Sequence, residues 1–271
     1  MAQLLRTEWL KIRNYPGFWW VMGVTLLSYP GINGLLYFLY KQQANSKEMA
    51  GQLVKMLVGN PFAFPEVFRT VAYSSSVFIF IPAILIIMLI SNEYTYKTNR
   101  QNIIDGWSRN EFLLAKFLNV VLVTFLVLLL NLAVTLVIGF YNTDNVNADS
   151  WKLLYYSGLF GLQVFSQLSF AFLLGMLIRR AFIALGIFIF YMMILENIIM
   201  GILKRYSNDL GRFLPLEVSD RITPVPAFLG RLNEEMYKRS LDLVQQHVWF
   251  TLLYTVVFWV VCYWVHKKRD L

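Results

Sequence analysis

The chain has 271 residues, with 24 Lys and Arg against 16 Asp and Glu, and a formal net charge of +8 at pH 7. It is 58% hydrophobic and only 15% charged, whereas about a quarter of the residues of a soluble domain are charged. This excludes an ordinary soluble globule. A single Cys excludes an internal disulfide framework, and only two His argue against a metal site. We therefore expect an integral membrane protein without metal or cofactor.

The first predicted element precedes the first apolar run. It combines one apolar helical face with basic side chains, as an amphipathic helix in the membrane interface does. The residues expected to form it are Leu5, Trp9, Lys11, Ile12 and Arg13. Its cations are expected near polar surface, beside anionic headgroups. An ordinary basic flank that only sets topology remains the alternative.

Six long apolar runs follow. They lie at about residues 18–40, 71–90, 112–140, 153–178, 181–203 and 248–265. About 20 apolar residues cross the hydrocarbon as a helix, and the short alternating segments of a transmembrane barrel are absent. The fold class predicted is an all-α membrane protein of six transmembrane helices, forming one domain over residues 1–271. Pro30 and Pro82 are expected to kink their helices.

The connection at 91–111 is the most informative stretch between the runs. Ile103, Ile104 and Trp107 fall at helical spacing, which predicts a short amphipathic surface helix that ends near Gly106. Ser108 is expected to cap the next helix, with Glu111 completing a capping box. Such a helix is suited to docking a soluble partner, although its charges have the alternative of pairing with one another or with lipid phosphate.

Glu196 is the only acidic residue inside an apolar run. Ionisable groups at membrane depth usually face a bundle interior and are often functional, so Glu196 is a candidate for the transport pathway. The alternative is a structural group that is hydrogen-bonded near the outer interface. The external segments at 41–70 and 204–247 are read either as short external helices or as solvated loops.

The distribution of Lys and Arg predicts the orientation. On the side that holds both termini and the 91–111 connection, Lys and Arg are roughly twice as dense as on the other side. The positive-inside rule therefore places both termini in the cytoplasm.

Polar residues around the second and third runs resemble those of the ABC-2 type transporter permeases. The matching positions are Glu93, Thr98, Arg100, Ser108, Arg109 and Lys116, and before the first run Glu8, Lys11 and Arg13. The motifs cover about 35 residues, while the architecture is similar over the whole chain. In two places the chain departs from the family pattern: Lys97 stands where Gly commonly precedes the Thr, and Trp107 where Pro often precedes the Ser-Arg pair.

The resemblance implies a division of labour. The chain would be the permease subunit of an ATP-binding-cassette transporter, without enzyme activity of its own, since it has no Gly-x-x-x-x-Gly-Lys-Ser/Thr phosphate loop. Its implied partners are two copies of a cytoplasmic ABC ATPase, a second or homologous permease, and membrane lipids. Export across the inner membrane is expected. The residues expected to couple to the ATPase are Glu93, Thr98, Arg100, Ile103, Ile104, Trp107, Ser108 and Arg109.

Two other classes of function remain as alternatives. The sequence Glu234-Glu235-x-x-x-Arg239 resembles an element of intramembrane proteases, but it lies outside the apolar runs, and such chemistry needs imidazoles beside the carboxylates. A membrane anchor or sensor that does not transport is the other alternative. Nucleic acid is not an expected partner, because the positive charge is spread over membrane flanks.

Overall fold

The computed structural model describes residues 2–44, 59–104, 106–206, 210–227 and 234–268. These residues form helices and turns without a strand, as the sequence predicts. Five helical segments are long and apolar enough to cross a membrane: α2 (Pro16–Ala44), α7 (Arg109–Asn142), Ala148–Ile178, Ala181–Arg205 and α14 (Val244–Lys268). A bent pair, α4 (Val67–Ser76) and α5 (Phe80–Thr95), makes a sixth crossing if it is counted as one span.

The sequence predicts a kink at Pro82 within the run at 71–90, and the chain bends close to that residue, between the two separate helices α4 and α5. The two helices meet at 50°, and the break precedes Pro82 instead of centring on it. Pro82 is the third residue of α5, where its missing N–H removes no intrahelical hydrogen bond. Its ring would collide with the carbonyl of residue 78 if the helix continued through that point, so the chain breaks there.

Two other crossings are also composite. η1 (Ala148–Trp151) leads into α8 (Tyr155–Ile178), and α9 (Ala181–Phe190) continues through a π-helical turn, η2 (Tyr191–Leu195), into α10 (Glu196–Tyr206). After these, η3 (Leu210–Phe213), α11 (Pro215–Asp220) and α13 (Glu234–Asp242) occupy the described parts of the predicted external segment at 204–247.

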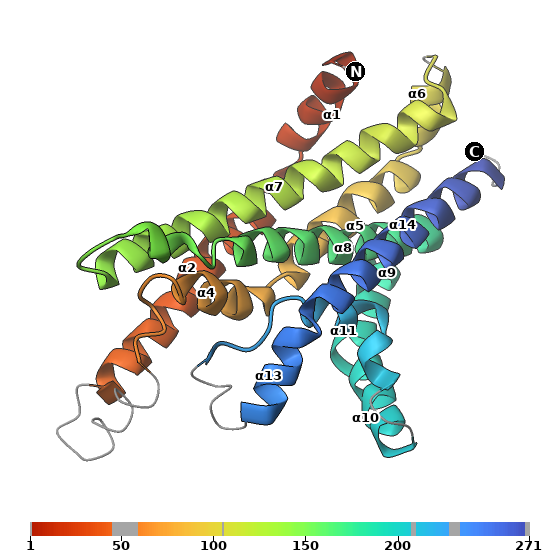
Figure 1. Ribbon diagram of the computed structural model, residues 1–271. Helices are drawn as coiled ribbons and strands as arrows, with labels where there is room; N and C mark the ends of the chain where they lie inside the picture. The colour runs from red at the N-terminus through yellow and green to blue at the C-terminus, as the bar shows by residue number, and fades with distance from the viewer. Residues whose placement is uncertain (1, 45–58, 105, 207–209, 228–233, 269–271) are drawn as a thin grey trace.

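The helix α8 is the centre of the bundle. Most of its residues are buried, and it packs against α4, α5, α7, α9 and α14 (Figure 1). Small residues allow this close packing: a Cβ on Gly175 would lie 2.5 Å from Cγ2 of Ile90 and 3.4 Å from the backbone of Ile87.

The two chain ends lie at one end of the bundle. Figure 1 shows α1 (Ala2–Arg13), the C-terminus of α14 and the short helix α6 (Thr98–Ile104) together at that end, which we call the α6 end. The helices α10 and α13 lie at the opposite end.

Candidate functional site

The helix α1 is held against the bundle by a buried face that includes a charge. Ile12 is 1% exposed and Glu8 is 2% exposed, and the ring of Trp9 lies edge-on to Phe18. Lys11 differs from the expectation that it lies at the polar surface, since its side chain is only 36% exposed and points to other helices. Nothing is described of the side chain of Leu5, and Arg13 is exposed as expected.

Six polar residues meet where α1, α5, α6 and α7 approach one another. We call them the charge cluster: Glu8, Lys11, Glu93, Asn102, Lys116 and Asn119. The amine of Lys116 donates to Oε2 of Glu8 at 2.6 Å and also to Oε1 of Glu93. The amine of Lys11 lies 3.3 Å from Glu8 and 3.4 Å from Glu93, and it donates to Oδ1 of Asn102 on α6 at 3.2 Å. One lysine from α1 and one from α7 thus link all four helices.

The charge cluster is buried and electrically balanced. Glu8, Glu93 and Lys116 are 2%, 7% and 5% exposed, and the two carboxylates face two ammonium groups. Burial by itself would raise the pKa of Glu8, but Lys116 and Lys11 outweigh that effect and hold the pKa below its ordinary value. Buried ion pairs of this kind contribute little net stability, yet losing one partner is costly because a charge is left unpaired.

The charge cluster also borders empty space. A cavity of about 170 Å³ is lined by Glu8, Lys11, Glu93 and Lys116 among others. Within the described part of the chain, Oε2 of Glu93 is buried without a hydrogen-bond partner. Glu93 therefore has an unused acceptor, and the lysines have room to rearrange around it.

The turn from α5 into α6 explains one departure from the family pattern. Lys97 has a φ of +55°, in the left-handed region that favours glycine. A glycine before Thr98 would adopt this turn without strain. At the other end of α6, Gly106 has a φ of +99°, and the N–H of Trp107 reaches back to the carbonyl of Asn102. The predicted short helix is thus present, and Gly106 lies in the turn that follows it.

The surface of α6 is partly apolar. Ile104 is 84% exposed, and Tyr96 just before α6 is 74% exposed. Because α6 is not one of the helices that could cross the membrane, lipid does not account for these exposed apolar side chains. The opposite face is buried through Asn99 and Asn102. The side chains of Arg100 and Ile103, both expected to take part in coupling, lie outside the described side chains.

The remaining residues expected to couple take different positions. Glu93 is buried in the charge cluster, and the hydroxyl of Thr98 is 3.5 Å from the carbonyl of Glu93. The ring of Trp107 lies 5.6 Å from the amine of Lys11. Glu93 and Thr98 thus lie at the base of α6, and Glu93 is shielded from the surface.

Ser108 and Arg109 fix the start of α7. Ser108 and Glu111 form the capping box that the sequence predicts. The guanidinium of Arg109 donates to the carbonyl of Lys267 at 2.8 Å, which ties the start of α7 to the end of α14.

Glu196 has the contacts of a structural group. It is 6% exposed, and its Oε1 accepts the backbone N–H groups of Leu216 and Glu217 at 2.9 and 3.0 Å. Both N–H groups belong to the first turn of α11, where they have no partner within the helix and Leu214 provides no side-chain cap. Glu196 therefore serves as the cap of α11. A role of Glu196 in transport is untested by this geometry, which favours the structural alternative.

The alternative of an intramembrane hydrolase gains no support. Glu235 and Arg239 are exposed on α13, and nothing is described of the side chain of Glu234. His247 is buried on α14, at the opposite end of that helix from His266. Among the described residues, no three His, Cys, Asp or Glu side chains are close enough to hold a metal ion.

Several partners in the site could not be assigned from the sequence. Asn102 and Asn119 were not expected to take part, although Asn119 follows Lys116 by three residues and so shares its face of α7. Near α11, Gln163 and Gln167 of α8 both donate to Oδ1 of Asp220, at 2.8 and 2.7 Å. The one feature of the sequence that indicated a buried role for the two glutamines was their position in an apolar run.

The fold and the site define an all-α, multi-pass membrane protein in which a short surface helix, α6, contacts a buried charge cluster. The family model described as ABC-2 family transporter protein matches residues 4–195. The chain therefore belongs to the ABC-2 transporter family and is a membrane component of an ABC transporter. No curated protein matches the sequence.

Proposed function

We propose that this chain forms the translocation pathway of an ABC exporter and receives the stroke of a separate cytoplasmic ATPase through α6. Membership of the family implies association with an ABC ATPase. In this proposal two permeases, either two copies of this chain or one copy and a homologue, pair with two ATPases in the inner membrane. Both termini and α6 face the cytoplasm in this proposal, in agreement with the higher density of Lys and Arg in the segments predicted for that side.

The observation that carries the proposal is that α6 has an exposed apolar residue at its C-terminus, while its opposite face is held by hydrogen bonds to the charge cluster. Ile104 presents an apolar side chain that is 84% exposed, which is suited to a pocket on a soluble partner. Beneath it, Asn102 binds Lys11, and Lys11 contacts both carboxylates of the charge cluster. A displacement of α6 is thereby passed to α1, α5 and α7 at once.

Because the charge cluster holds two carboxylates and two ammonium groups, its ion pairs can form in more than one arrangement. Lys116 bridges Glu8 and Glu93, and Lys11 reaches the same two carboxylates from the solvent side. When α6 moves, the lysines can exchange carboxylate oxygens without leaving a charge unpaired, and Oε2 of Glu93 offers a spare acceptor. Packed junctions with discrete alternative pairings are the usual elements of such transitions.

Co-purification tests the proposal. Tagged wild-type protein should retain an ABC ATPase, and Ile104→Glu should lose it while the permease remains folded. The matched control is Val146→Glu, because Val146 is also exposed but lies between the end of α7 and η1, at the far end of the 34-residue helix that begins beside α6. Equal retention of the ATPase by Ile104→Glu and wild type would contradict docking through α6. A tagged chain that never retains an ATPase would instead favour an anchor or sensor.

A further inference from the structure

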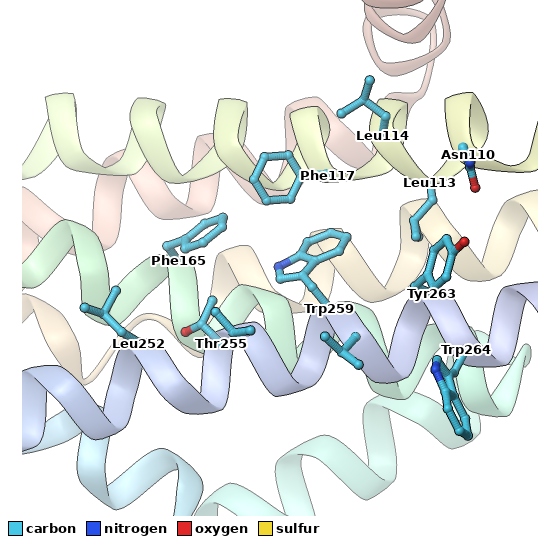
Figure 2. A pocket seen from close by; sticks show the side chains of 12 residues that line it. Asn110, Leu113, Leu114, Phe117, Phe165, Leu252, Thr255, Trp259, Tyr263 and Trp264 are labelled. Atoms are coloured by element: carbon cyan, nitrogen blue, oxygen red, sulfur yellow. The ribbon is translucent and has the colours of Figure 1, made fainter.

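An apolar groove runs between α7, α8 and α14, away from the charge cluster. Its volume is about 610 Å³. Its floor is aromatic: Figure 2 shows Phe117, Phe165 and Trp259 turned toward one another between the three helices. The ring centres of Phe117 and Trp259 are 4.9 Å apart, and those of Phe117 and Phe165 are 5.8 Å apart. These edge-to-face contacts join α7 to α8 and to α14 at the base of the groove.

The length of the groove limits what can occupy it. Along α14 its lining extends from Leu252 to Trp264, which is about 18 Å at 1.5 Å per residue. That is close to one leaflet of a hydrocarbon core of about 30 Å and much shorter than a transmembrane helix. A lipid acyl chain matches this length, whereas a helix of another subunit would extend well beyond it.

One end of the groove carries positive charge. Lys267 and Lys268 are exposed at the end of α14, and the amine of Lys268 lies 4.6 Å from the ring centre of Trp264, which lines the groove. Arg109 is held beside them through its hydrogen bond to the carbonyl of Lys267. The carboxylate nearby in sequence, Glu111, is engaged in the capping box. The apolar wall thus ends beside three cations, Arg109, Lys267 and Lys268, at the last turn of α14.

We propose that this groove is a binding site for an anionic phospholipid of the surrounding bilayer, with one acyl chain along Phe117 and Trp259 and its phosphate at Lys267 and Lys268. Each cation near a membrane surface favours an anionic lipid by about 1 kcal/mol, which is about fivefold in affinity. The site fastens α14 to α7 beside the start of α7, and it differs from the α6 docking surface in both chemistry and position.

Native mass spectrometry of the purified full chain tests the charge part. Detergent-solubilised protein is supplied with dioleoyl phosphatidylglycerol or dioleoyl phosphatidylcholine, which share acyl chains. Phosphatidylglycerol should be retained in preference, and Lys267→Gln with Lys268→Gln should remove about fivefold of that preference per cation. The control is Lys204→Gln with Arg205→Gln, which removes the same charge from exposed positions on α10 and should leave the preference unchanged.

Filling the groove tests the apolar part. Val256→Trp should reduce retention of both lipids, since Val256 lines the groove and is 59% exposed, and Val260→Trp provides a second variant from the same wall. Val137→Trp, at an exposed position on α7 outside the groove, should retain both lipids, and gel filtration reports folding of each variant. Equal retention of the two lipids by wild type, or undiminished retention by both groove variants, would overturn the proposal. So would a polypeptide that co-purifies and occupies this face.

Discussion

Replacing Lys116 by Met is the sharpest perturbation of the charge cluster. Lys116 is 5% exposed and its amine contacts both Glu8 and Glu93, so its removal leaves two buried carboxylates facing only Lys11. Breaking a buried ion pair by removing one partner typically costs about 3 to 5 kcal/mol. Because the total stability of a folded domain is only about 5 to 15 kcal/mol, we expect a large fall in unfolding free energy.

Restoring the charge balance should recover much of this loss. In the double variant Glu93→Gln with Lys116→Met, Lys11 and Glu8 remain as one matched pair, and the new amide has no charge to compensate. The two substitutions together should therefore cost clearly less than the sum of the two single ones. The matched control is Lys152→Met, because the Lys152–Asp149 pair is exposed at 68% and 80% of its side chains and should contribute less than about 1 kcal/mol.

The assay is unfolding of the purified chain in mixed micelles, followed by helical circular dichroism over a denaturant series. We expect a low midpoint for Lys116→Met, a recovered midpoint for the double variant and an unchanged midpoint for Lys152→Met. Additive costs in the double variant would refute the inference that Lys116 and Glu93 are coupled inside the bundle.

Three further predictions follow from single positions. Because the pKa of Glu8 is lowered, its ionised form should stabilise the fold above the ordinary glutamate pKa and lose that contribution as pH falls through the lower folded value; acid titration of stability should therefore show a flatter decline in Glu8→Gln. Lys97→Gly should raise the unfolding free energy by up to about 1 kcal/mol by relieving a left-handed residue, and a lower thermal midpoint would count against this. Gly175→Leu should destabilise by at least about 1 to 3 kcal/mol through its clash with Ile90, whereas Gly158→Leu, where a Cβ meets open space, should be tolerated in the same melting assay.

The helices themselves were predictable because membrane insertion imposes a simple rule. Each apolar run of the sequence lies within a long helix or the bent pair, since about 20 apolar residues in a row have few alternatives. The short helix before Gly106 and the cap at Ser108 were predictable for a similar reason: their signals lie within a few neighbouring residues.

Contacts between segments that are distant in the sequence could not be predicted. Glu8 entered the prediction only through the family resemblance, and nothing in the sequence indicated its buried contact with Lys116, which is 108 residues distant. Glu196 reads as a charge in an apolar run, yet it satisfies the backbone of α11 about twenty residues later. Pro82 predicted a kink in this run, but the sequence did not show that one helix would end at Ser76 and the next begin at Phe80.

The most direct test of the central claim is photo-cross-linking from α6. A photoreactive phenylalanine analogue is placed at Ile104 of the full chain, and in a second sample at Val146, before illumination in membranes. Docking through α6 predicts an adduct of this chain with an ABC ATPase from position 104 and none from position 146. An ATPase adduct from position 146, with none from position 104, would contradict both the proposed orientation and the proposed coupling surface.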